Sequence, residues 1–253
     1  MNEGRKRTVL VTGGAKRVGA AIVRHLAAQG HRVVIHYGNS QLEAARLAAE
    51  TGGVAIGADL ADQSAVTNLI GESAELAGAP IDGLVNSASL FEFDRPPLDD
   101  WALLERLMPV NLGAPVLLAS ALARQPGLAD GAVVNLLDQK VANLNPDFFS
   151  YTCTKVALAG ATEMLARALA PAVRVNAVAP GLTLPSGDQS AEEFAQVSRE
   201  NLLRRQVDIE EIARAVDLLL TSTSITGQTM FVDCGQRFLP RDGDVMFEMR
   251  ARP

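Results

Sequence analysis

The chain has 253 residues, a formal charge of −6 at pH 7 and a sequence pI near 5.2, so it offers no broad basic surface and we expect no nucleic-acid partner. Hydrophobic residues make up 48% of it and charged residues 21%, which is enough apolar surface to offset chain entropy and argues against disorder. Its two cysteines give no disulfide framework and its three histidines have no metal-ligand spacing, so we expect no metal site.

The first residues favour a protein of the reducing cytoplasm. The basic run 5–7, interpreted as a solvated flank, leads directly into the apolar run 8–11, which is too short for the core of a signal peptide. No apolar run approaches the roughly 18 residues of a membrane span. We therefore expect a cytoplasmic protein with no membrane partner.

Short runs rich in β-branched residues alternate with longer segments of helical period, which is typical of βαβ units around a parallel sheet. Most strands are apolar on both faces, so helices should cover both sides. We predict a single-domain α/β fold over residues 1–253, a doubly wound, Rossmann-type sheet of seven parallel strands. The predicted strands are 8–12, 32–37, 53–57, 81–86, 131–137, 172–178 and 228–233. The predicted helices are 18–29, 41–51, 63–77, 99–123, with a kink at Pro109, 149–170 and 209–222.

Two segments fall outside this alternation. Residues 184–206 contain Pro185, Ser186 and Gly187 and then a polar helix, which indicates a substrate lid or a plain surface insertion. The C-terminal tail, 238–253, is expected to close a pocket, to reach a neighbouring subunit or to be disordered.

The first strand runs into a turn with Gly13 and Gly19, and a helical pattern follows. Glycine allows backbone angles and close approaches that a Cβ would block, and the free N–H groups at a helix start can hold a pyrophosphate. The spacing differs from the general dinucleotide fingerprint, so a purely structural turn is the alternative.

The second strand ends without the acid that usually binds an adenosine ribose. His36, Asn39 and Ser40 offer donors instead, which favours NADP(H) over NAD(H), although Gly38-Asn39 is also a good turn sequence.

Tyr151 and Lys155 open a long predicted helix and lie one turn apart on the same face. A nearby ammonium is expected to lower the pKa of the tyrosine and to make the phenol a proton-transfer catalyst near neutrality. Such a pair is common in helices. Catalysis is favoured because the pair follows the fifth strand in a chain that also carries the turn with Gly13 and Gly19.

Taken together, these features resemble the short-chain dehydrogenase/reductase family, and within it the pteridine reductases most closely. The resemblance covers nearly the whole chain. Its elements, in chain order, are the T-G-x-x-x-x-x-G turn, Asp59-Leu60 after the third strand, Asn86-Ser87-Ala88-Ser89 after the fourth, Asn111, Y-x-x-x-K, and Pro180-Gly181-Leu182-Thr183 after the sixth.

The resemblance implies roles for these positions. Asp59 and Leu60 would hold the adenine, Thr183 the nicotinamide carboxamide, and Lys155 the nicotinamide ribose. Asn111 would anchor a water in the proton relay, unless it only repairs the helix kink. The implied catalytic residues are Asn111, Asp138, Tyr151 and Lys155. The implied cofactor-binding residues are Gly13, Lys16, Arg17, Val18, Gly19, His36, Tyr37, Asn39, Ser40, Asp59, Leu60, Asn86, Ser87, Ala88, Tyr151, Lys155, Pro180, Gly181, Leu182 and Thr183.

Three departures from the general family point to a pterin substrate. Arg17 stands where most members have glycine, and it can reach a cofactor phosphate or a substrate oxygen. Asp138 replaces the usual catalytic serine, and a carboxyl group can bind an aminopyrimidine edge; the alternative is a loop cap. Phe91 matches an aromatic residue that stacks on a pterin ring, or is a core residue. The implied substrate-binding residues are Arg17, Ser89, Phe91, Asp138 and Tyr151.

The favoured function is therefore hydride transfer from NADPH to a C=N or C=O carbon of a small planar substrate, a dihydropterin or related pteridine. One alternative is a general carbonyl or 3-oxoacyl-thioester reductase of the same family. Another is a non-catalytic NADP(H)-binding sensor. The resemblance also implies a homotetramer built through the helices at 99–123 and 149–170 and the C-terminal strand region.

Overall fold

The computed structural model describes residues 5–186 and 189–247, and within these ranges seven parallel strands form one sheet in the order β3-β2-β1-β4-β5-β6-β7. Each strand lies within two residues of its predicted bounds at either end. The doubly wound fold is thus confirmed. The strands are β1 (Thr8–Thr12), β2 (Arg32–Tyr37), β3 (Val54–Gly57), β4 (Gly83–Asn86), β5 (Gly131–Leu136), β6 (Val173–Pro180) and β7 (Thr229–Val232).

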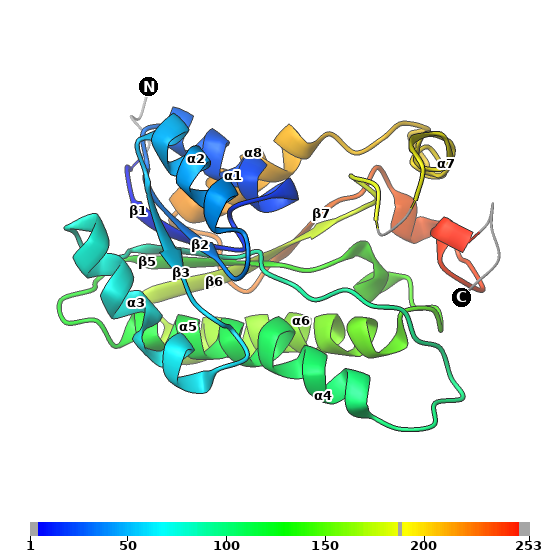
Figure 1. Ribbon diagram of the computed structural model, residues 1–253, viewed down its shortest axis with the longest axis horizontal. Helices are drawn as coiled ribbons and strands as arrows, with labels where there is room; N and C mark the ends of the chain where they lie inside the picture. Colours follow the sequence, from blue (N-terminus) through cyan, green and yellow to red (C-terminus); the bar gives the residue numbers. More distant parts are fainter. Residues whose placement is uncertain (1–4, 187–188, 248–253) are drawn as a thin grey trace.

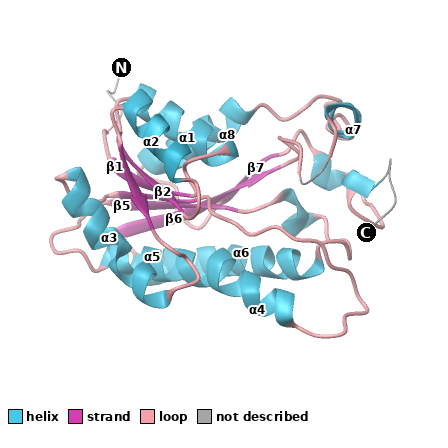
Figure 2. Ribbon diagram, in the orientation of Figure 1, coloured by secondary structure: helices cyan, strands magenta, loops and turns pink. Residues whose placement is uncertain are grey.

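Helices cover both faces of the sheet, as the apolar strands require (Figure 1, Figure 2). One core cluster packs β-strand side chains against α1, α2 and α8, and the other packs them against α3, α5 and α6. The helices are α1 (Arg17–Ala28), α2 (Gln41–Thr51), α3 (Gln63–Ala77), α4 (Ala102–Met108), α5 (Ala114–Ala123), α6 (Phe149–Leu169), α7 (Ala191–Val197) and α8 (Ile209–Thr221). The polar helix expected after residue 187 is α7; residues 187 and 188 lie outside the described ranges.

The predicted helix 99–123 is continuous but changes its winding at Pro109. A π-helical turn, Pro109–Gly113, joins α4 to α5, and the Ala114 N–H bonds the Pro109 carbonyl five residues earlier. Together they form the one helix of the described residues, Ala102–Ala123, that is long and apolar enough to cross a membrane by length and composition, with a mean hydropathy of 1.3. Half of the 18-residue stretch with this mean hydropathy is buried inside the fold, which is typical of a core helix.

The basic run 5–7 is not a solvated flank throughout. The Arg7 side chain is buried, with its Nε donating to the Leu220 carbonyl at 2.8 Å and an Nη donating to the Asp130 carbonyl at 2.9 Å. A buried guanidinium must have such partners, and hydropathy alone does not reveal them. The interpretation was therefore wrong for Arg7.

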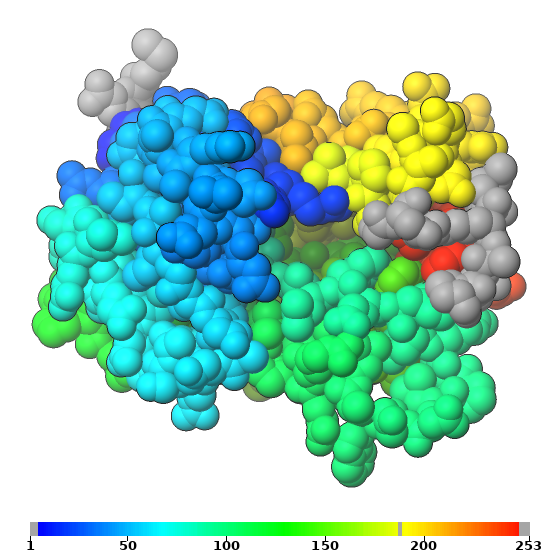
Figure 3. All heavy atoms as spheres, viewed as in Figure 1, coloured from blue at the N-terminus to red at the C-terminus, as the bar shows by residue number. Residues whose placement is uncertain are grey.

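The sheet order positions the site. Because β1 lies between β2 and β4, the chain winds in opposite directions on either side of the β1–β4 pair, and the loops that leave these strands part at their carboxyl ends. Figure 3 shows the molecule hollowed there, between the blue N-terminal region and the yellow region near α7, with green residues below.

Candidate active site

A cavity of about 980 Å³ opens at the carboxyl ends of the strands. Most of the predicted site residues line it, so segments that are far apart in the sequence meet at one place. Tyr37, Ser40, Asn86 and Asn111 are the predicted residues outside its wall. Those that line it are Gly13, Lys16, Arg17, Val18, Gly19, His36, Asn39, Asp59, Leu60, Ser87, Ala88, Ser89, Phe91, Asp138, Tyr151, Lys155, Pro180, Gly181, Leu182 and Thr183.

The glycine-rich turn between β1 and α1 is built for close backbone approach. Gly13 has φ +61°, and a Cβ there would lie 2.8 Å from the Ala88 Cα. A Cβ on Gly19 would lie 2.2 Å from the Gly13 carbonyl oxygen. The residue before α1, Lys16, makes no side-chain cap, so the first-turn N–H groups of the helix remain for an anion. This cradle fits the pyrophosphate of a dinucleotide.

Replacing Gly19 by alanine tests the cradle. No real Cβ tolerates a 2.2 Å contact, so the turn or the helix must shift, and we expect NADPH to bind at least about tenfold more weakly. Titration of cofactor fluorescence measures this. The matched control is Gly71→Ala in α3, where an added Cβ meets nothing within 4 Å. Equal NADPH affinity in the two variants would contradict the assignment.

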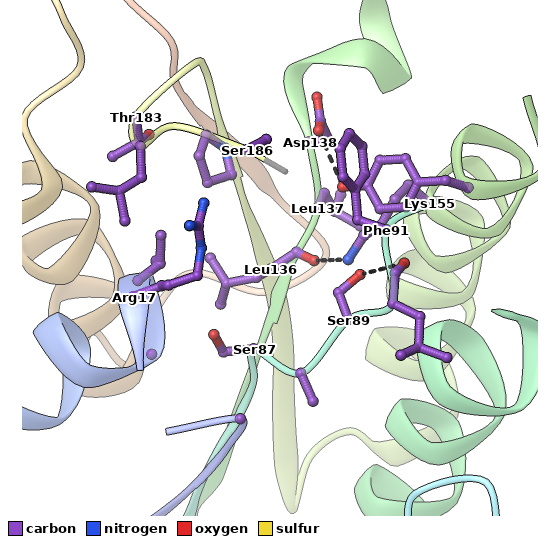
Figure 4. A pocket seen from close by; sticks show the side chains of 18 of the residues that line it. Arg17, Ser87, Ser89, Phe91, Leu136, Leu137, Asp138, Lys155, Thr183 and Ser186 are labelled. Atoms are coloured by element: carbon purple, nitrogen blue, oxygen red, sulfur yellow. Dashed lines mark hydrogen bonds between the residues drawn. The ribbon is translucent and has the colours of Figure 1, made fainter. Parts of the chain in front are cut away.

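Tyr151, Asp138 and Lys155 all line the cavity, and Figure 4 shows Asp138 and Lys155 on the same side of it. The Tyr151 hydroxyl donates to Asp138 Oδ2 at 3.1 Å, and Asp138 Oδ1 accepts from the Lys140 N–H at 2.9 Å. The Lys155 Nζ donates to the Leu136 carbonyl at 2.8 Å and lies 5.7 Å from the centre of the Tyr151 ring. The spacing of Tyr151 and Lys155 therefore does place both on the cavity side of α6.

The electrostatics of this group differ from the expectation. Burial raises the pKa of Tyr151 well above its usual range, and the Asp138 carboxylate raises it further. Burial also raises the pKa of Asp138 and lowers that of Lys155 to about 8. The expectation that the ammonium lowers the tyrosine pKa was therefore wrong for this geometry. Tyr151 instead keeps its proton and donates it to a hydrogen bond with the carboxyl group.

Phe91 lies beside this group on an aromatic cluster. Its ring stacks on Phe148, with centroids 4.2 Å apart, and meets the Tyr151 ring edge-on at 4.7 Å. Phe148 also packs against Phe93 and Phe247. Phe91 remains 40% exposed and lines the cavity, so it presents apolar surface next to the Tyr151 hydroxyl.

Comparison with known proteins agrees with this geometry. A family model described as enoyl-(acyl carrier protein) reductase matches residues 13–237. The chain belongs to the short-chain dehydrogenase/reductase family. It is 42% identical to the FolM alternative dihydrofolate reductase 1 of Brucella suis in complex with NADP, with a TM-score of 0.88, covering 92% of this chain and 96% of that one.

Two further relatives cover similar lengths. The Brucella canis FolM alternative dihydrofolate reductase 1, complexed with NADP, is 44% identical with a TM-score of 0.87, covering 92% of this chain and 94% of that one. A dihydromonapterin reductase of Klebsiella pneumoniae subsp. pneumoniae is 30% identical over 243 residues, covering 93% of this chain and 99% of the relative. The resemblance predicted from the motifs is thereby confirmed. The prediction that NADP(H) is the cofactor is confirmed as well, since both solved relatives contain NADP.

His36 differs from its predicted role in this short-chain reductase. Its Nδ1 accepts from the Gly13 N–H and its Nε2 bonds the Ala58 carbonyl, both at 3.1 Å. Burial lowers its pKa, so the ring is neutral. With both ring nitrogens occupied, His36 shapes the glycine-rich turn and has no donor left for a phosphate. Lys16, which pairs with Glu43 at 2.8 Å, and Asn39 are exposed at this end of the cavity, and so is the carboxyl group of Asp59.

Arg17 has a backbone φ of +53°, in the left-handed region that favours glycine. This backbone conformation fits the glycine that the family resemblance implies at the position. A non-glycine residue there costs about 1–2 kcal/mol, so the side chain needs a compensating role. Its Nη2 donates to the Pro185 carbonyl at 2.7 Å, and this bond joins the glycine-rich turn to the segment 184–206. Leu184 and Ser186 of that segment also line the cavity.

The predicted asparagines lie behind the cavity wall. The Asn111 Oδ1 accepts from the Leu90 N–H at 2.8 Å, and its Nδ2 donates to the Leu90 carbonyl and to Thr154 Oγ1. This buried side chain thus ties the loop before Phe91 to α6. Asn86 donates to Asn135 Oδ1 at 2.8 Å inside the sheet. Of the other two, Tyr37 packs its ring near Gly57, and Ser40 precedes α2.

Sequence reasoning missed part of the substrate end of the cavity. Its wall also includes Lys140 and residues of the C-terminal tail, among them Arg241, Asp244 and Met246. The sequence left three possibilities open for the tail. Within the described range it lines the cavity, while residues 248–253 lie outside that range. The one available signal was the apolar run 245–247, which is buried.

Proposed function

We propose that this short-chain reductase uses NADPH to reduce a dihydropterin or a related pteridine. The observation that carries the proposal is the hydrogen bond from Tyr151 to Asp138, beside the partly exposed side chain of Phe91, in the cavity that the glycine-rich turn also lines. A carboxyl group at this place suits an aminopyrimidine edge better than a simple carbonyl. The names of the relatives, dihydromonapterin reductase and alternative dihydrofolate reductase, support the same substrate class.

NADPH supplies the hydride when it is bound. The turn at Gly13 and Gly19 and the start of α1 would hold its pyrophosphate, Asp59 and Leu60 would border the adenine, and Thr183 would hold the nicotinamide end; all of them line the same cavity. Lys16 and Asn39 are exposed polar groups that line the cavity, and in this proposal they would donate hydrogen bonds to the 2′-phosphate.

Three side chains orient the substrate. The partly exposed side chain of Phe91 would pack on the flat ring, Asp138 would accept hydrogen bonds from its polar edge, and Ser89 lines the same cavity. Arg17 approaches from the opposite side, as Figure 4 shows. In this proposal, the substrate ring lies between these two sides of the cavity.

Proton delivery falls to Tyr151. Its raised pKa keeps the phenol protonated, and its hydroxyl points into the cavity toward Asp138. Lys155, fixed by the Leu136 carbonyl, places its ammonium beside the Tyr151 ring and would donate to the nicotinamide ribose. Asn111 is a positioning residue, because it holds the Phe91 loop against α6.

The decisive experiment measures NADPH oxidation with purified protein and a panel of dihydropteridines, alongside simple ketones and 3-oxoacyl thioesters. We expect turnover with the dihydropteridines and a clear preference for NADPH over NADH. Turnover confined to ketones or thioesters would favour the general carbonyl reductase. NADPH binding without turnover on any substrate would favour the sensor.

The same proposal covers assembly and location. We place the protein in the cytoplasm as a single-domain homotetramer, with residues 184–206 as the substrate lid. Exposed apolar side chains on α6, among them Val156 and Met164, support an interface there. Leu218 and Phe238 near the β7 edge support a second one.

A further inference from the structure

The last described residues, Leu239–Phe247, form what we name the C-terminal strap. Arg241, Asp244, Val245 and Met246 from the strap line the cavity, and residues 245–247 are buried. Met246 and Phe247 pack in the aromatic cluster with Phe148 and Tyr151. The red segment of Figure 1 lies beside α7 at the carboxyl ends of the strands. The strap is therefore a wall of the substrate end of the cavity.

Lys140 fastens the strap to the segment that follows β5. The residue is 2% exposed, and its Nζ donates to Asn145 Oδ1 at 3.0 Å, to the Asp147 carbonyl at 2.9 Å and to Asp244 Oδ2 at 2.9 Å. All three donors of the ammonium are thus used. A buried ammonium needs a paired charge, and Asp244 provides it across 104 residues of sequence.

Asp244 is itself fixed from both sides. Its N–H donates to Asp147 Oδ2 at 2.7 Å, and its Oδ1 accepts from the Met246 N–H at 3.0 Å. Its side chain is 15% exposed. Neither the direction of the carboxylate nor the path of the strap is free to vary without breaking these bonds.

The same lysine also holds Asp138. Its backbone N–H donates to Asp138 Oδ1 at 2.9 Å, while its ammonium holds Asp244 Oδ2. One residue therefore bonds two carboxyl groups of the cavity wall, one on the reaction side and one on the strap. Both bonds come from the short 3₁₀ turn Gln139–Ala142, so the strap and Asp138 are joined through one residue.

The charged and titratable groups around Asp138 come from three elements: Lys140 from the 3₁₀ turn, Tyr151 and Lys155 from α6, and Asp244 from the strap. After burial, which raises the pKa of Asp138 most, Lys140 lowers it and Asp244 raises it. Burial and Asp138 raise the pKa of Tyr151, and Asp244 adds to this rise. The strap carboxylate thus acts on both members of the pair.

We propose that the C-terminal strap is a fixed wall of the substrate site and that Asp244, held by Lys140, is a positioning residue for the Asp138–Tyr151 pair. The inference rests on the proposed dihydropterin reduction. It assigns Asp244 an effect on proton transfer beyond the fastening of the strap.

The test is Asp244→Asn, which keeps the shape of the side chain and removes its charge. Losing that charge leaves the Lys140 ammonium uncompensated near Asp138, so the pKa of Asp138 must fall. We expect the limb of the kcat/KM pH profile that belongs to Asp138 to move to lower pH by about one unit. The matched control, Asp242→Asn, makes the same charge change at an exposed strap position, and its profile should overlay that of the wild type.

A second variant reverses the sign. Lys140→Met removes the positive charge, so the same limb should move to higher pH. If this variant does not fold, Asp244→Asn still decides the question. A profile of Asp244→Asn that coincides with that of Asp242→Asn, with only a lower melting temperature, would overturn the proposal and leave Asp244 a structural latch.

A readout independent of turnover separates this inference from the proposed function. Carbon-13 NMR of aspartate carboxyl groups, with Asp138 assigned by its loss in Asp138→Asn, gives the Asp138 pKa directly. A lower Asp138 pKa in Asp244→Asn than in the wild type supports the inference even if no dihydropterin is reduced. An unchanged Asp138 pKa would overturn the inference even if dihydropterins are good substrates.

Discussion

Tyr151→Phe should lower the turnover number for NADPH-dependent dihydropterin reduction by about 10²- to 10⁴-fold, the usual contribution of a positioned acid. The substitution removes one oxygen and leaves the ring in contact with Phe91. It takes away the proton that the raised pKa of Tyr151 keeps on the phenol. Since the Lys155 bond to Leu136 does not involve the tyrosine, cofactor binding should survive.

Stopped-flow measurement of NADPH oxidation in single turnovers gives the chemical step directly. Cofactor fluorescence and thermal unfolding serve as controls for binding and folding. Turnover within about threefold of the wild type would mean that another group or water delivers the proton. Loss of NADPH binding would instead assign the tyrosine to the cofactor.

The fold and the pairing of Tyr151 with Lys155 could be predicted from local patterns in the sequence, whereas most of the other site residues were implied by the resemblance to the family. Strands such as β5 are apolar on both faces, and the alternation with helical periods predicts a parallel sheet without knowledge of any contact. The four-residue spacing of Tyr151 and Lys155 is a property of the helix itself. These inferences need only the periodicity of apolar residues and the spacing of two residues along the chain.

The remaining features depend on distant contacts. Whether Tyr151 gains or loses acidity depends on its burial and on the 3.1 Å bond to Asp138, and neither is visible in a spacing. The pairing of Lys140 with Asp244 joins two ordinary charged residues 104 positions apart. The side chain of His36 could donate to a phosphate, but in the structure both of its ring nitrogens bond the backbone, at Gly13 and Ala58. Only the folded geometry separates such alternatives.

Asp138→Ser distinguishes a pteridine reductase from a general carbonyl reductase. A serine at this place restores the hydroxyl typical of the wider family but cannot accept two hydrogen bonds from an aminopyrimidine edge. We expect kcat/KM for a dihydropterin to fall by about 100-fold or more, since a buried polar edge left unpaired is costly. Turnover of simple ketones should stay level or rise.

The isosteric Asp138→Asn refines this result, because it keeps the size of the side chain but can no longer ionise. The pKa of Asp138 is raised by burial, so a rate that depends on its ionisation has a limb above the ordinary carboxyl range, and this limb must vanish in the asparagine variant. Steady-state profiles with dihydropterin and with ketone, measured on the same preparations, separate recognition from proton transfer. A limb that persists in Asp138→Asn would assign it to another group. Equal losses on both substrates in Asp138→Ser would mean that Asp138 serves the shared chemistry, with pterin recognition located elsewhere on the wall.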